Sequence, residues 1–144
     1  MEAREIMTGQ VIAVSPQDTV HQLARVLTEA GISGAPVRDD EGRLLGIVSE
    51  ADGISKRGAH VKDVMRRSVL TVAEDTPVEE VCYMMSSNNI NRVPVMRGEY
   101  VVGIITRADV VRAFAQGKIG HAGGGAEIDA MHVGTDTESQ VSRA

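Results

Sequence analysis

The sequence predicts an α/β fold built from two related repeats that pack as a pseudo-twofold pair. First, the phrase GIVSEAD, Gly46–Asp52, returns almost unchanged as GIITRAD, Gly103–Asp109. Second, other segments repeat in the same order. The matched pairs are 6–20 with 64–78 and 31–37 with 89–95. Third, both copies alternate helical apolar spacing with short strand-like runs, and one copy alone is too small to hide its apolar face.

Each repeat is expected to open with a short strand and continue into a helix. In the first copy, QDTVHQLARVLTEA carries apolar residues at helical spacing and ends at Gly31. In the second, Thr76 is expected as N-cap, Pro77 as the first helical residue and Glu79 as the partner in a capping box. That helix should end at Asn89, because glycine and asparagine best tolerate a left-handed helix end.

Two strands and a second helix complete each copy. The runs APV and LLGIVS flank the turn RDDEGR, and VPV and YVVGIIT flank MRGE. A helix should follow each hydroxyl, and the one after Ser49 should be short because it contains Gly53. Each repeat is therefore predicted as β-α-β-β-α, with the first repeat at 1–57 and the second at 58–116. The segment 117–144 is Gly-, Ser- and Thr-rich and is expected to be a flexible tail, with a short strand or partner-binding segment at 128–133 as an alternative.

Composition narrows the class of protein. The chain has 144 residues and 42% apolar residues, which suits one module with an aliphatic core, since Tyr83, Tyr100 and Phe114 are its aromatic residues. Scarce aromatics and a net charge of -5 argue against nucleic-acid binding. No apolar run approaches the roughly 20 residues of a membrane span, and the charged start lacks a signal-peptide core. With Cys82 as the single cysteine, we expect a cytoplasmic protein without disulfides.

The repeated motifs resemble those of a known family. The pairs IMT and VMR, ISGAPV and INRVPV, and GIVSEAD and GIITRAD resemble a tandem pair of cystathionine-β-synthase (CBS) domains, the Bateman module, over about residues 4–116. The resemblance implies a regulatory fold, usually a homodimer, that binds adenosine-containing ligands in clefts between the two repeats. AMP, ADP, ATP or another adenosyl compound is the expected ligand, and an unknown effector protein is a possible partner.

The resemblance also assigns roles to individual residues. The motif's acid holds the ribose hydroxyls and its hydroxyl residue contacts phosphate. The expected nucleotide-binding residues are Asp109 and Thr106 at one cleft, Asp52 and Ser49 at the pseudo-symmetric one, Arg92 for phosphate, Asn91 where energy-sensing members often have His, and Ile12, Ile32, Ser33 and Gly34 for the adenine.

The residues themselves leave a second interpretation open. A helix N-terminus favours phosphate, and a carboxylate can accept from two ribose hydroxyls. However, Thr106-x-x-Asp109 and Ser49-x-x-Asp52 are also capping-box signatures, in which the side chains satisfy the N–H groups of their own helix. The duplication after similar strands favours binding over capping alone.

The two motifs should differ in affinity. The Asp109 motif gathers Thr106, Arg107 and Arg92, whereas the aligned positions of the first copy are Ser49, Glu50 and Gly34. We therefore expect phosphorylated ligand at Asp109 and weaker or no binding at Asp52. Arg107 could instead lie on a solvated helix face.

The sequence gives little support for metal binding, a phosphate-binding loop or catalysis. His121 and His132 have no Cys partner at metal-ligand spacing, so no metal is expected, and GHAGGG lacks the Lys of a phosphate-binding loop. No nucleophile, base and acid can be assembled, so the chain is not expected to be an enzyme, although a small nucleotide hydrolase is a rival. The main alternative is a ligand-free protein-interaction or dimerisation module.

Overall fold

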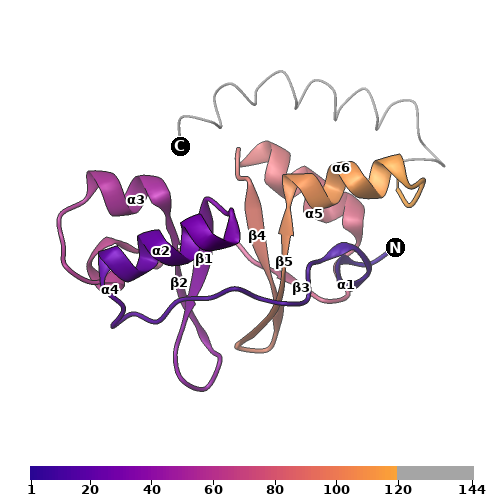
Figure 1. Cartoon of the computed structure of the whole chain (residues 1–144). Helices are drawn as coiled ribbons and strands as arrows, with labels where there is room; N and C mark the ends of the chain where they lie inside the picture. Colours follow the sequence, from indigo (N-terminus) through magenta and orange to yellow (C-terminus); the bar gives the residue numbers. More distant parts are fainter. Residues whose placement is uncertain (120–144) are drawn as a thin grey trace. The chain divides into compact units, whose positions relative to one another are not determined.

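The computed structural model describes residues 1–119, in which helices and strands alternate as expected for a mixed α/β fold (Figure 1). The elements are α1 (Ala3–Ile6), α2 (Val20–Ala30), β1 (Gly34–Arg38), β2 (Leu44–Ser49), α3 (Glu50–Ser55), α4 (Val61–Val64), β3 (Val72–Ala73), α5 (Val78–Ser87), β4 (Arg92–Arg97), β5 (Tyr100–Thr106) and α6 (Arg107–Ala115). The segment 128–133, a candidate strand, lies outside the described residues.

The chain forms two compact units that do not follow the order of the repeats. The Asp109 unit consists of Met1–Gly9, Thr71–Arg97 and the chain from Val102 onward. The Asp52 unit consists of Gln10–Leu70 and Gly98–Val101. The opening segment of each repeat, with its short helix α1 or α4, is thus part of the unit that contains the body of the other repeat.

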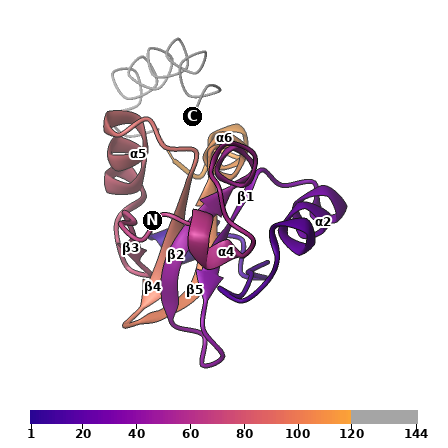
Figure 2. The ribbon, with the colours of Figure 1, turned by 90° about the vertical axis from the view of Figure 1, so that its left-hand side faces the viewer.

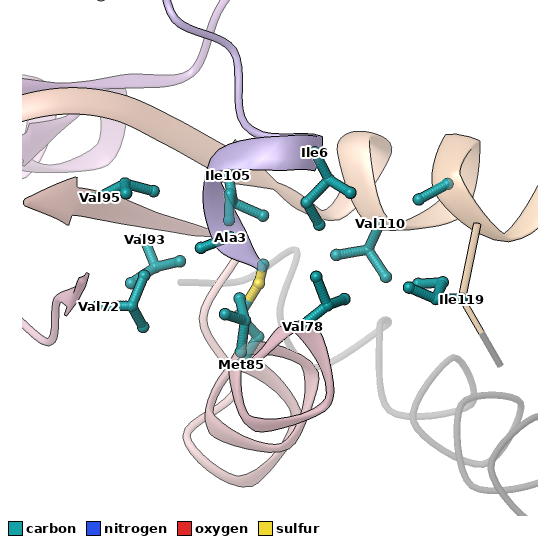
Figure 3. Packing of buried hydrophobic residues seen from close by; sticks show 12 residues of the cluster. Ala3, Ile6, Val72, Val78, Met85, Val93, Val95, Ile105, Val110 and Ile119 are labelled. Atoms are coloured by element: carbon teal, nitrogen blue, oxygen red, sulfur yellow. The ribbon is translucent and has the colours of Figure 1, made fainter. Parts of the chain in front are cut away.

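The Asp109 unit is organised around the three-stranded sheet β3-β4-β5, in which β3 runs parallel to β4. The core combines side chains of the sheet, both long helices and α1 (Figure 3). Its buried residues are Ala3, Ile6, Val72, Val78, Val81, Met85, Val93, Val95, Ile105, Val110, Ala113 and Ile119. Burial of Ala3 and Ile6 anchors the N-terminal segment to this unit.

The Asp52 unit has an antiparallel pair, β1 and β2, with a register shift between Val37 and Arg38. Figure 2 shows α2 and α4 beside this hairpin. The buried core is also aliphatic. It contains Val14, Leu23, Leu27, Ala35, Val37, Val48, Val61, Val64 and Met65.

Most predicted helix ends are confirmed. Gly31 ends α2 at φ +66°, and Asn89 follows α5 at φ +52°, so both adopt the left-handed conformation expected of them. The helix α3 is short, and Thr106 is the N-cap of α6. The prediction for the start of α5 is wrong. Pro77 is the N-cap, and the Thr76 hydroxyl accepts instead from the Ala73 N–H at 2.9 Å in the preceding turn.

The short opening strand is present in the second repeat and is reduced to a bridge in the first. In the second repeat β3 has two residues, and in the first Val14 forms a single parallel bridge with Val37. The four-residue helices α1 and α4 were missed, because one helical turn is too short to show apolar periodicity.

Residues 117–119, which the sequence assigns to the expected tail, are held in the Asp109 unit. The Lys118 N–H donates to the Ala113 carbonyl at 2.8 Å, and Ile119 is buried in the core of the Asp109 unit. The prediction of flexibility for 120–144 lies outside the described residues.

In both units the opening segment pairs with the strand that leads to the motif aspartate. Thr8 and Ile104 exchange backbone hydrogen bonds of 2.8 and 3.0 Å, and Arg66 and Ile47 exchange bonds of 2.8 and 2.9 Å. This close approach requires the glycine that precedes each pairing residue. A Cβ on Gly46 would lie 2.5 Å from the Arg66 carbonyl oxygen.

At the equivalent Gly103, a Cβ would overlap the side chain of Met7. The obstacle is therefore a backbone carbonyl in one unit and a methionine side chain in the other. Methionine can rearrange where a hydrogen-bonded carbonyl cannot.

We expect Gly46→Ala to lower the free energy of unfolding by about 2–3 kcal/mol and Gly103→Ala by about 1 kcal/mol, because a carbonyl yields less than a side chain. Urea denaturation measures both. Gly9→Ala is the control, since its Cβ would meet nothing within 4 Å. Equal values for Gly46→Ala and Gly9→Ala would contradict the role assigned to the close approach.

Candidate functional site

The Asp109 carboxylate caps its own helix with one oxygen. Its Oδ2 accepts from the Thr106 N–H at 2.8 Å and from the Thr106 hydroxyl at 3.1 Å. In return, Thr106 Oγ1 accepts from the Asp109 N–H at 3.3 Å. The motif is therefore a formed capping box, as the second interpretation of the sequence anticipated.

The other oxygen of Asp109 contacts side chains from two elements. Oδ1 accepts from the Thr8 hydroxyl at 3.2 Å and from Arg112 Nη1 at 2.9 Å. Asp109 is only 3% exposed, whereas the Arg112 side chain is 57% exposed. The acid is thus buried and held in place, while the cation beside it lies at the surface.

A second pair of polar side chains lies in the same unit. The Arg107 N–H donates to the Asn91 carbonyl at 3.0 Å, and Arg107 Nε donates to Asn91 Oδ1 at 3.4 Å. Arg107 is half-buried rather than on a solvated face. Arg92, the residue after Asn91, is half-buried at the start of β4. The Asp109 unit therefore contains all four polar residues expected at its site, namely Asn91, Arg92, Thr106 and Asp109.

The Asp52 motif has the same cap and different partners. Asp52 Oδ2 accepts from the Ser49 N–H at 3.0 Å, and Ser49 Oγ accepts from the Asp52 N–H at 3.1 Å. Oδ1 faces two cations, Arg66 Nε at 3.2 Å and Lys56 Nζ at 3.1 Å. Lys56 also donates to the Val64 carbonyl at 3.1 Å.

These contacts determine the charge of Asp52. Its burial, at 2% exposure, raises the pKa of the carboxyl. Hydrogen bonds from the Ser49 backbone, Lys56 and the Ser49 side chain, together with the charge of Arg66, outweigh burial and hold the pKa below the ordinary 3.8. Asp52 is therefore ionised at neutral pH.

The residues expected to contact adenine, Ile12, Ile32, Ser33 and Gly34, belong to the Asp52 unit. Ile12 is exposed and Gly34 is buried. The Ser33 carbonyl accepts from the Glu50 N–H at 2.9 Å, which matches the bond between Arg107 and Asn91 in the other repeat. Their contact with adenine stays a prediction.

Sequence reasoning missed the side chains that contact the second oxygen of each aspartate. Thr8 and Arg66 occupy the same position of the two repeats, directly after the aligned Met7 and Met65. Arg112 and Lys56 follow their aspartates by one helical turn, a spacing at which ion pairs form. The alignment of the repeats thus placed Thr8 opposite Arg66. Nothing in the alignment showed that the opening segments lie against the aspartates.

Within residues 1–119 there is no group of three or more His, Cys, Asp or Glu side chains that could hold a metal ion. In the same part of the chain, no helix has the length and apolar character needed to cross a membrane. His121 and His132 lie outside the described residues. The expectation that the chain is not an enzyme stays a prediction.

The family model of the CBS domain matches the chain twice, at residues 3–56 and 61–116. The structure is similar to the crystal structure of CBSX2 of Arabidopsis thaliana in complex with AMP, with a TM-score of 0.78 and 29% identity, covering 82% of this chain and 98% of that one. It is also similar to the CBS domain pair of protein MJ0100 in complex with 5′-methylthioadenosine and S-adenosyl-L-methionine. There the TM-score is 0.75 and the identity 30%, over 82% of this chain and 98% of that one.

Among curated relatives, the chain is 38% identical over 114 residues to inosine-5′-monophosphate dehydrogenase of Methanocaldococcus jannaschii. The match covers 77% of this chain and 23% of that enzyme. Two other relatives from the same organism are likewise matched over only 36% and 23% of their length. The chain thus spans a minor part of these longer proteins.

Asp52 should contribute stability in a pH-dependent way. Because its folded-state pKa lies below 3.8, its contribution is present above that value and is lost as the pH falls through the folded-state pKa. We expect Asp52→Asn to destabilise the protein at about pH 7 and to match the wild type more closely toward about pH 3.

Urea denaturation across this range measures the difference, and Asp40→Asn, which removes an exposed carboxylate of the same unit, is the control. A destabilisation by Asp52→Asn that stayed constant as the pH fell would argue against the ion pairs.

Proposed function

The chain belongs to the CBS domain family as a tandem pair, and on this basis we propose that it is a regulatory module that binds an adenosyl compound without converting it. The observation that carries the proposal is the buried Asp109 carboxylate. One of its oxygens is fixed by the cap of α6, and the other faces a hydroxyl and an exposed guanidinium.

This arrangement suits a ribose diol. Two vicinal hydroxyls are donors, as are the groups on Asp109 Oδ1, the Thr8 hydroxyl and Arg112. Because the Arg112 side chain is 57% exposed, water can solvate its guanidinium when a ribose hydroxyl takes its place on Oδ1. The oxygen engaged in the cap keeps the carboxylate in place during the exchange.

The surroundings favour a phosphorylated ligand. The N-terminus of the nine-residue helix α6 carries partial positive charge, and Thr106 is its N-cap. Arg107 and Arg92 lie in the same unit and can pair with phosphate oxygens. The assignment of Thr106 and these arginines to phosphate rests on this chemistry and on the family's motif.

The ligand class follows from the diol. AMP, ADP, ATP, S-adenosylmethionine and 5′-methylthioadenosine all present it. AMP in CBSX2 and the two adenosyl sulfur compounds in MJ0100 make this class the one to test.

Ligand binding would act through linkage. A ligand that prefers one conformation or dimer arrangement shifts its population, and a tenfold shift needs about 1.4 kcal/mol of differential binding. We propose a homodimer that passes this shift to an effector protein.

A specific observation favours the alternative, a ligand-free interaction module. Both capping boxes are complete within the protein itself. Large apolar side chains are also exposed on three helices, Ile54 on α3, Tyr83 on α5 and Val111 on α6. Such side chains can form a protein interface.

A thermal-melt screen distinguishes the two functions. Adenosyl ligand at a hundred times its Kd should add about 2.7 kcal/mol of stability to the wild type, a rise of several degrees. Asp109→Asn should remove the rise, because an amide offers one acceptor oxygen where the carboxylate offers two. The control is Asp75→Asn, an exposed carboxylate of the same unit.

The screen uses AMP, ADP, ATP, S-adenosylmethionine and 5′-methylthioadenosine. A rise with any of them that Asp75→Asn keeps and Asp109→Asn loses supports the proposal. No rise with the whole set favours the interaction module.

A further inference from the structure

The two motif aspartates differ at one equivalent position, the residue that follows Met7 or Met65. Thr8 pairs with Ile104 and Arg66 with Ile47 through the same two backbone hydrogen bonds. Both side chains then reach Oδ1 of the motif aspartate, each at 3.2 Å. The position is therefore equivalent in backbone geometry and in target, and only the chemistry of the side chain differs.

At Asp109 the side chain from the opening segment is neutral. The Thr8 hydroxyl donates without a charge of its own, so a ribose hydroxyl can replace it like for like. The charged partner of Oδ1, Arg112, comes from the same helix and extends into solvent. Asp109 Oδ1 thus has one charged and one neutral partner.

At Asp52 the corresponding oxygen is held by two positive charges. Arg66 approaches from the opening segment and Lys56 from the end of α3. Each of these contacts joins opposite charges, and a neutral diol brings no counter-charge in their place. Removing both cations would leave a carboxylate that is 2% exposed without its counter-charges.

We propose that this position determines whether a motif aspartate is available to a ligand. Thr8 leaves Asp109 available, whereas Arg66, together with Lys56, closes Asp52, so the chain binds one adenosyl ligand and not two. The inference rests on the proposed function and adds to it the stoichiometry and the residue that sets it.

Isothermal titration with 5′-methylthioadenosine tests the inference. This probe lacks a phosphate, so an added guanidinium cannot strengthen binding by pairing with one. The wild type should bind one equivalent of 5′-methylthioadenosine per chain.

Thr8→Arg should place a second cation on Asp109, as at Asp52, and weaken binding by about tenfold or more. Thr8→Met, which adds length without charge, should weaken binding by less than about threefold. Thr8 is exposed, and Arg occupies the equivalent position, so Thr8→Arg is expected to fold. A melting curve without ligand verifies this, and Thr8→Lys replaces the variant if it does not fold.

The possible outcomes separate this inference from the function on which it rests. Two equivalents per wild-type chain, with the second lost in Asp52→Asn, would overturn the inference and leave the function intact. Unchanged affinity in Thr8→Arg, or equal losses in Thr8→Arg and Thr8→Met, would do the same. A wild type that binds neither 5′-methylthioadenosine nor AMP would overturn the proposed function itself.

Discussion

The close approach of each opening segment to a motif glycine is the constraint on which the rest of the site depends. The Arg66 carbonyl can accept from the Ile47 N–H because the neighbouring Gly46 has no side chain. The same pairing aligns the residue after each methionine with the buried aspartate. Each motif glycine, which the sequence alone shows only as a strand residue, is thus required for this close packing. The packing in turn determines which side chain contacts the aspartate.

Capping uses one oxygen of the Asp109 carboxylate and the proposed ligand binding would use the other, so the two interpretations of the motif do not exclude each other. In Asp109, Oδ2 completes the cap of α6, while Oδ1 faces Thr8 and Arg112. A buried carboxylate is stable only when its oxygens have partners. Internal donors supply them here, and an adenosyl ligand would compete with these donors rather than fill a vacant position.

Local signals in the sequence predicted the repeats, the α/β class and the ends of α2 and α5, because glycine at Gly31 and asparagine at Asn89 act on their own backbone. Long-range partners could not be predicted. Thr8 meets Asp109 across 101 positions of the chain, and no periodicity encodes that contact. The error at Thr76 has a local origin, since its hydroxyl serves the preceding turn and cannot also cap the helix.

The contacts of the two motif aspartates differ in how readily a ligand could replace them. Asp52 has a depressed pKa, two cations and a complete cap, so its interactions stabilise its unit whether or not a ligand is present. Asp109 keeps the same cap, but its other oxygen meets one neutral hydroxyl and one cation, so it has one counter-charge fewer than Asp52. Under the proposed function this difference matters, because contacts as strong as those at Asp52 would leave a ligand little to gain. A single exchange of Thr for Arg at equivalent positions is enough to account for this difference.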